Sequence, residues 1–181
     1  MRYFPPFVET ISDVPEYLTG VHKLSESITR LTAVSKKEKI TILLADDDLD
    51  DCEFFEEAMG ELEQKTKLNC VHDGAELLAY LKKEKSLKPD IIFLDINMPS
   101  IDGLECLKEI RKEKSMNDIP VVMFTTSTNP EHVITAYEKG ANLFWSKPES
   151  HDELMSMTKK IFSLNWDLHP PKNGKANFVV E

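Results

Sequence analysis

The chain has 181 residues, of which 41% are hydrophobic and 30% charged, and its formal net charge at pH 7 is −10. This composition is typical of a globular chain with one domain and extensions, and its acidity argues against general nucleic-acid binding, which needs a basic surface. The sequence contains neither an apolar run of about 20 residues that could span a membrane nor the apolar centre of a secretory leader, so we expect a cytoplasmic protein.

The first 38 residues differ from the rest and form an N-terminal extension. Apolar residues recur there at gaps of four and three, which predicts an amphipathic helix over residues 16–34: Tyr17, Val21, Leu24, Ile28 and Leu31. Such a short stripe fits a helix that packs on its own domain, which we favour, but it also fits a docking or dimerisation helix. The basic run at residues 35–39 predicts a linker.

From residue 40 onward, short aliphatic strands alternate with amphipathic helices. Strands are predicted at residues 40–45, 68–73, 90–95, 119–126 and 141–148, and helices at residues 51–64, 74–85, 103–114, 130–140 and 150–165. Five aliphatic strands separated by helices predict an α/β fold, in which a parallel sheet is covered by helices on both faces. In such sheets, ligands bind beyond the carboxyl ends of the strands.

Chemically active side chains stand at four of these strand ends. Asp46 and Asp47 follow the first strand, Asp95 the third and Lys147 the fifth, while Thr125 lies at the end of the fourth. Three crowded carboxylates destabilise a fold unless a cation compensates their charge, and Mg²⁺ is the hard cation that prefers such oxygens and bridges to phosphate. Together with a lysine and a hydroxyl, this is the equipment for phosphoryl transfer to a carboxylate.

Other phosphate-binding devices are missing from the sequence. The only Gly-Lys pair, Gly174-Lys175, lacks the upstream glycine of a P-loop, and no G-x-G or G-x-S-x-G motif occurs. Nucleotide binding through a P-loop or a dinucleotide fingerprint, and hydrolysis through a serine nucleophile elbow, are therefore excluded.

Four segments together resemble the receiver domain of two-component response regulators: ILLADDDLDD, DIIFLDINMPSIDG, PVVMFTTS and LFWSKP. They occur in the order typical of the family, and each contains a predicted strand. The resemblance covers residues 39–165. It implies a flavodoxin-like (βα)5 fold with a doubly wound five-stranded sheet in the order 2-1-3-4-5.

The resemblance also implies a role for each residue at the strand ends. Asp95 matches the phosphoacceptor, and Asp46 and Asp47 match the acidic pair that holds Mg²⁺. Asp95 would also be a metal ligand. Thr125 and Lys147 match the hydroxyl and the lysine that contact the phosphoryl group.

Three finer features follow from the same resemblance. The backbone carbonyl of Asn97 would be a further metal ligand, and a cis peptide bond would join Lys147 to Pro148. Phe144 matches the aromatic residue that moves inward as the threonine is drawn to the phosphoryl group. Trp145 would point to the opposite face, on the surface of the fourth and fifth helices where partners of this family dock.

The implied function is that of a response regulator, which is not an enzyme acting on a separate substrate. It would accept a phosphoryl group from a histidine kinase or a histidine phosphotransfer protein and then change its binding to a downstream protein that the sequence does not name. Only a tail follows at residues 166–181, so we expect a stand-alone receiver whose last residues fray or add a strand to a partner. A homodimer is left open.

Two other functions stay open. The first is a receiver-like scaffold that binds partners without phosphorylation, which the complete set of acidic residues disfavours. The second is a Mg²⁺-dependent phosphohydrolase with an aspartyl-phosphate intermediate. Such enzymes place an acid–base carboxylate two positions after the nucleophile, where this chain has Asn97 after Asp95.

Overall fold

The computed structural model describes residues 38–83, 88–127, 129–164, 166 and 178–180. The helix expected over residues 16–34 lies outside these ranges. Among the described helices, none is long and apolar enough to cross a membrane.

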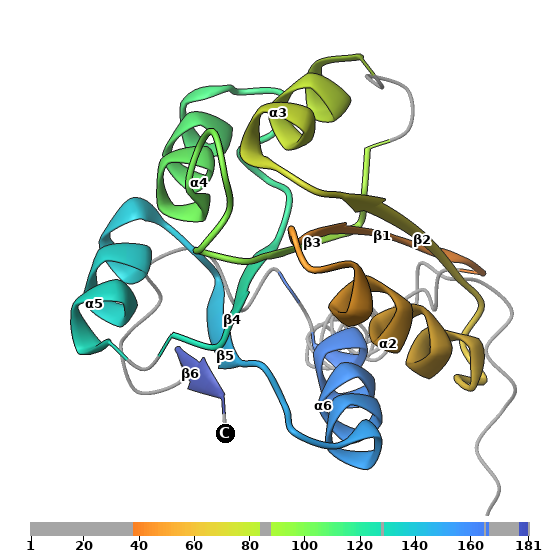
Figure 1. Ribbon diagram of the computed structural model, residues 1–181. Helices are drawn as coiled ribbons and strands as arrows, with labels where there is room; N and C mark the ends of the chain where they lie inside the picture. The colour runs from red at the N-terminus through yellow and green to blue at the C-terminus, as the bar shows by residue number, and fades with distance from the viewer. Residues whose placement is uncertain (1–37, 84–87, 128, 165, 167–177, 181) are drawn as a thin grey trace, which may run out of the picture. The chain divides into compact units, whose positions relative to one another are not determined.

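Strands and helices alternate along the described chain (Figure 1). Their bounds are β1 Ile40–Ala45, α2 Leu49–Gly60, β2 Thr66–Val71, α3 Gly74–Lys83, β3 Ile91–Leu94, α4 Gly103–Lys112, β4 Val121–Thr125, α5 Pro130–Lys139, β5 Leu143–Ser146, α6 His151–Ser163 and β6 Val179–Val180. The strands form one parallel sheet in the order β2-β1-β3-β4-β5-β6. The predicted order 2-1-3-4-5 is therefore confirmed, with a sixth strand added beyond β5.

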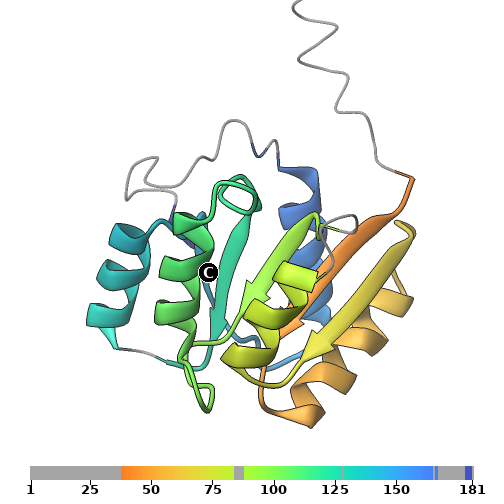
Figure 2. The same cartoon turned by 90° about the horizontal axis from the view of Figure 1, so that it is seen from above.

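The sheet lies between two groups of helices, with α3, α4 and α5 on one face and α2 and α6 on the other (Figure 1, Figure 2). Alternation along the strands sends successive side chains to opposite faces. Leu43 accordingly belongs to the core under α3, α4 and α5, and Leu44 to the core under α2 and α6. Burial of both faces explains why the strands are continuously apolar.

The core under α2 and α6 is built around four aromatic rings. Phe93 packs against Phe55 with ring centroids 4.9 Å apart, and Phe124 packs against Trp145 at 5.0 Å. Trp145 faces away from Phe144, as expected from strand alternation, but only 1% of its surface is exposed. The expectation that Trp145 lies on a docking surface is therefore wrong, because α6 covers this face of β5.

Short polar side chains fix where the helices begin. Asp48, Asp102, Asn129 and Ser150 each accept a hydrogen bond from a backbone N–H in the first turn of α2, α4, α5 and α6, respectively. Because Asp48 caps α2, this helix starts at Leu49, two residues earlier than predicted. Because the caps start these helices soon after the preceding strands end, the strand-end residues stay close to the sheet.

The C-terminal end of the chain completes the sheet. Val179–Val180 pair in parallel with β5, and the N–H of Phe144 donates to the carbonyl of Phe178 at 2.7 Å. The Phe178 ring is 4% exposed and lies 5.2 Å from the Tyr137 ring and 6.3 Å from the Phe144 ring. The prediction that this segment frays or pairs with a partner is therefore corrected, since a buried aromatic anchor holds it on the chain's own β5.

Phe178→Ala is expected to lower the free energy of unfolding by about 3 kcal/mol, because it removes a buried aromatic ring and leaves a cavity. Urea denaturation of the purified protein measures this change. Val179→Ala is the matched control, since Val179 is 44% exposed and its truncation should change stability by less than about 1 kcal/mol. If both variants unfold like the wild type, the ring of Phe178 does not anchor the segment.

Candidate functional site

The candidate site lies at the carboxyl edge of the sheet, where neighbouring strands end side by side. Ala45 pairs with Leu94, so Asp46 and Asp95 follow at equivalent positions, and the N–H of Asp95 donates to the carbonyl of Ala45 at 2.9 Å. Thr125 pairs with Ser146 in the same way. The strand register thus brings residues separated by up to about a hundred positions into one place.

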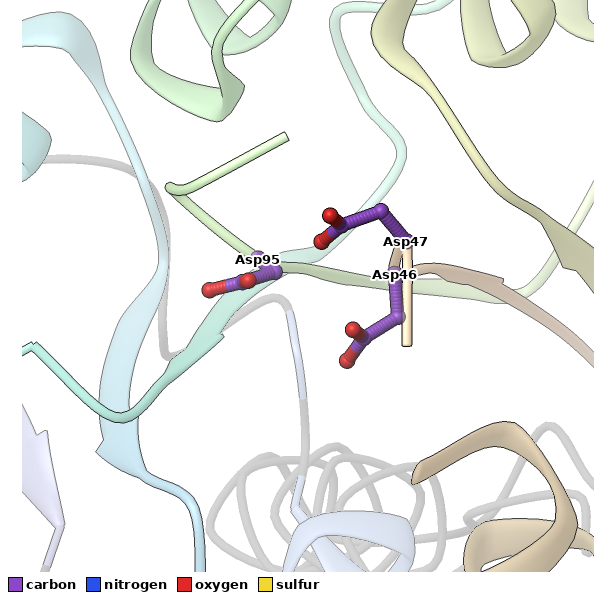
Figure 3. A group of neighbouring side chains, drawn as sticks. All are labelled: Asp46, Asp47 and Asp95. Atoms are coloured by element: carbon purple, nitrogen blue, oxygen red, sulfur yellow. The ribbon is translucent and has the colours of Figure 1, made fainter. Parts of the chain in front are cut away.

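Three carboxylates converge at this edge, as Figure 3 shows for Asp46, Asp47 and Asp95. One oxygen from each of them lies within 4.8 Å of the others. Asp46 is fully buried and Asp95 is 5% exposed, whereas Asp47 faces solvent. Carboxylate oxygens in this number and proximity fit a hard divalent cation such as Mg²⁺, which is usually held by a few carboxylates and waters.

Backbone donors orient the two buried carboxylates. One oxygen of Asp46 accepts from the N–H of Asp48 at 3.2 Å, and one oxygen of Asp95 accepts from the N–H of Ile96 at 2.7 Å. Each carboxylate therefore keeps its second oxygen, Oδ2, for other partners.

The ammonium group of Lys147 lies among these carboxylates. Its Nζ is 2.7 Å from Oδ2 of Asp46 and 3.8 Å from Oδ2 of Asp95. A fourth carboxylate also reaches it, because Oδ2 of Asp51, in the first turn of α2, lies 2.6 Å from the same nitrogen. Sequence reasoning assigned Asp51 no role.

Burial and charge act in opposite directions on the pKa values of the site. Burial tends to lower the pKa of Lys147, but the hydrogen bonds from its ammonium to Asp46 and Asp51 outweigh this effect and raise the pKa. Burial raises the pKa of Asp46 from 3.8 to about 6, because the loss of hydration outweighs the contacts with Lys147 and with the N–H of Asp48. The lysine is thus firmly charged, while Asp46 takes up a proton at a higher pH than an ordinary carboxyl group does.

Thr125 is the last residue of β4 and is fully buried. Its hydroxyl oxygen accepts a hydrogen bond from the N–H of Ser127 at 3.2 Å. The hydroxyl of Ser127 in turn forms a hydrogen bond with Nδ1 of His132 at 2.7 Å. This Ser–His pair was not predicted, and its only signal in the sequence is the spacing of a serine two residues before an N-cap.

The turn after β3 is packed directly on the backbone of Asp95. Gly103 donates its N–H to the carbonyl of Ile96 at 3.0 Å, and a Cβ at Gly103 would approach the carbonyl oxygen of Asp95 to 1.9 Å. Glycine is therefore required at this position by the close approach of two backbones. Asn97 is exposed, and the role of its carbonyl as a metal ligand stays a prediction.

Two features at β5 complete the predicted set. Phe144 is 1% exposed and packs beside Phe178, so the ring lies in the core with the C-terminal segment next to it. Lys147 donates its backbone N–H to the carbonyl of Thr125 at 2.9 Å, which places its side chain over the site. The expected cis bond before Pro148 is wrong, since the described residues contain no cis peptide bond and trans is the lower-energy isomer even before proline.

Comparison with known proteins assigns this arrangement to a family. Residues 42–159 match the model of the response regulator receiver domain. Response regulator Rcp1 of Synechocystis sp. is 34% identical over 126 residues, which cover 67% of this chain and 86% of that protein. Its Mn²⁺-bound crystal structure superposes with a TM-score of 0.63 and covers 70% of this chain and 94% of the other.

A second similar structure is that of the phosphorylated cyanobacterial phytochrome response regulator RcpA. It is 31% identical, has a TM-score of 0.63, and the match covers 68% of this chain and 91% of that one. The match to the family model, at residues 42–159, includes all four strand ends that form the site. The chain therefore belongs to the response regulator receiver domain family of two-component signalling.

Proposed function

We propose that this protein is a cytoplasmic phosphorylation switch in which Asp95 accepts a phosphoryl group from a phosphohistidine, with Mg²⁺ held by Asp46, Asp47, Asp95 and the backbone carbonyl of Asn97. The donor is a histidine kinase or a histidine phosphotransfer protein. One observation carries the proposal: Oδ2 of Asp95 lies 3.8 Å from Nζ of Lys147, in a group of carboxylates whose oxygens approach within 4.8 Å of one another.

In the transfer step, a carboxylate oxygen of Asp95 attacks the phosphorus atom of the phosphohistidine in line with the phosphorus–nitrogen bond. An acyl phosphate forms on Asp95, and the nitrogen keeps the bonding electron pair and takes up a proton from water. When bound at Asp46, Asp47 and Asp95, Mg²⁺ would supply charge neutralisation for the phosphoryl oxygens. Lys147 adds a second positive charge at the same place, and the Thr125 hydroxyl donates a hydrogen bond to a phosphoryl oxygen.

The readout of the switch is a change in protein binding. Drawing the Thr125 hydroxyl toward the phosphoryl group alters the space at the end of β4, and Phe144 on the neighbouring strand responds to it. Phe144 is already buried beside Phe178, so its movement is coupled to the C-terminal segment. An equilibrium of this kind is shifted by a few kcal/mol, and phosphorylation changes populations of two arrangements of the same fold.

The proposal is tested by incubating the wild-type protein with Mg²⁺ and acetyl phosphate or phosphoramidate and recording its intact mass. The expected result is a gain of the mass of one phosphoryl group, which is lost again in acid. A chelator added before the donor should prevent this gain. If no donor, including the purified histidine kinases of the source organism, produces the adduct, the phosphorylation-independent scaffold replaces this proposal. Rapid turnover of a small phosphomonoester would instead favour a phosphohydrolase.

Mg²⁺ affinity is expected to decrease as the pH is lowered, because the metal competes with the proton on Asp46. The pKa of Asp46 is raised from 3.8 to about 6, so in the metal-free protein this group stabilises the fold below about pH 4 and loses that contribution as the pH rises through about 6. At pH 5, Mg²⁺ binding therefore has to include the deprotonation of Asp46, which costs free energy. The dissociation constant for Mg²⁺ at pH 5 should exceed that at pH 7 by about tenfold.

Isothermal titration calorimetry with Mg²⁺ at several pH values measures this dependence. The control is the same Mg²⁺ titration of Asp46→Asn. This variant lacks the carboxylate that titrates, so it should bind Mg²⁺ more weakly than the wild type at every pH. A dissociation constant for the wild type that stays flat between pH 5 and pH 7 would contradict the role of Asp46.

A further inference from the structure

Lys147 is held by a carboxylate from outside the strand-end set. Asp51 lies in the first turn of α2, 96 residues before Lys147, and its Oδ2 accepts a hydrogen bond from Nζ at 2.6 Å. The same nitrogen lies 2.7 Å from Asp46 but 3.8 Å from Asp95. The ammonium group therefore sits on the α2 side of the site, within hydrogen-bonding distance of two carboxylates and beyond that distance from Asp95.

An ammonium group has three N–H donors and behaves as a compact point charge on a flexible stem. One of its donors is directed to Asp51, Asp46 lies 2.7 Å away as an ion pair, and the Phe124 ring lies 5.9 Å away. A phosphoryl group on Asp95 would draw Nζ toward β3, since Nζ lies 3.8 Å from Oδ2 of Asp95, while the hydrogen bond to Asp51 pulls Nζ toward α2. Asp51 thus competes with the phosphoryl group for the lysine.

The strength of this competition is limited by solvent. The side chain of Lys147 is 9% exposed, whereas that of Asp51 is 35% exposed. Water screens the outer carboxylate and can replace Lys147 as its partner, so the ion pair is of the weak, breakable kind found near surfaces. A contact of this strength can restrain the lysine before phosphorylation and still be given up when a doubly charged group arrives.

We propose that Asp51 is a positioning residue for Lys147: it holds the ammonium group on the α2 side of the unphosphorylated site and sets how readily the lysine engages a phosphoryl group on Asp95. The inference rests on the proposed function, because it concerns the same acceptor. It predicts that removal of the Asp51 charge tightens the hold on the phosphoryl group, even though Asp51 never contacts that group.

The test uses beryllofluoride with Mg²⁺, since this anion occupies the position of a phosphoryl group on a carboxylate without any transfer. Isothermal titration calorimetry compares the wild type with Asp51→Asn and Asp50→Asn. Asp50 is exposed, lies in the same helical turn and loses the same charge, so long-range electrostatics affects both variants alike. Asp51→Asn should bind beryllofluoride about fivefold more tightly than Asp50→Asn does.

Two further variants separate positioning from a structural role. Asp51→Glu should restore the wild-type dissociation constant for beryllofluoride, because it returns the carboxylate. In a Lys147→Ala background, Asp51→Asn should change that constant no more than Asp50→Asn does, since the partner of Asp51 is gone. Urea denaturation shows whether each variant is folded under the conditions of the titration.

The outcomes are distinct for the two proposals. Asp51→Asn that binds beryllofluoride like Asp50→Asn, or more weakly than the wild type, overturns the positioning role of Asp51 while leaving the phosphoacceptor in place. An equal effect of Asp51→Asn with and without Lys147 overturns it as well. If the wild type binds no beryllofluoride and takes up no phosphoryl group, the proposed function itself fails.

Discussion

Asp95→Asn is expected to abolish phosphoryl uptake altogether. The amide keeps the size of the side chain and can still accept from the N–H of Ile96, which contacts the carboxylate at 2.7 Å, but it is no nucleophile toward phosphorus. Removal of a negative charge from a crowded acidic group also relieves repulsion, so the variant should fold at least as stably as the wild type. Intact-mass measurement after incubation with Mg²⁺ and acetyl phosphate gives the result directly.

Asp102→Asn serves as the matched control for this experiment. Asp102 follows the same turn and caps α4 by accepting from the N–H of Glu105 at 2.8 Å, a role that asparagine fills equally well. This variant should take up one phosphoryl group, as the wild type does. Labelling of Asp95→Asn to the wild-type level would show that another side chain, such as that of Asp46, is the acceptor.

Gly103→Ala is expected to damage the fold and the site together. The added methyl group would lie 1.9 Å from the carbonyl oxygen of Asp95 and 3.0 Å from Cα of Ile96, and both neighbours are backbone atoms that cannot rotate away. Relief of this contact has to move α4 or the residue that carries the acceptor carboxylate. We expect a loss of about 3 kcal/mol in the free energy of unfolding and a clear weakening of Mg²⁺ binding.

Gly60→Ala makes the same chemical change at a position without crowding. Gly60 ends α2, and nothing lies within 4 Å of the position that its Cβ would take. Alanine there should leave stability unchanged or raise it by up to about 1 kcal/mol. Urea denaturation and Mg²⁺ titration of the two variants side by side decide the matter, and equal behaviour of both would rule out the close packing of α4 on Asp95.

The architecture of the sheet could be predicted because its local signals agree with one another. All four residues of β3, Ile91–Leu94, are buried, as the continuous apolar run requires of a central parallel strand. Asp95 ends that run, and the parallel order then places it beside Asp46 without any knowledge of side-chain contacts. Strand ends, unlike loop interiors, are fixed by the register of the sheet, so residues at these ends can be located from the sequence.

Asp51 could not be found in this way. An acidic residue in the first turn of a helix is common for a local reason, since it interacts favourably with the helix dipole and with free N–H groups. Asp50 and Asp51 therefore look alike in the sequence, and only the direction of α2 relative to β5 distinguishes the one that reaches Lys147.

Trp145 and Phe178 illustrate a second limit of sequence reasoning. Strand alternation correctly separated Trp145 from Phe144, but it does not say whether a helix covers the opposite face, and α6 does. Phe178 directly precedes β6, a strand of only two residues that is too short to carry a periodic pattern. Its pairing with β5 depends on tertiary contacts with Tyr137 and Phe144, which no local signal reveals.

The position of β6 also bears on how the protein behaves at high concentration. A parallel sheet that ended at β5 would present a row of unpaired backbone groups, which is a template for aggregation with other chains. In the described part of the chain, the Phe144 N–H on that edge is already paired with the Phe178 carbonyl, and the new outer strand has only two residues. The opposite outer strand, β2, carries the exposed charge of Lys67. Both edge strands of the sheet are thus poor templates for pairing with another chain, and the protein should resist edge-to-edge aggregation.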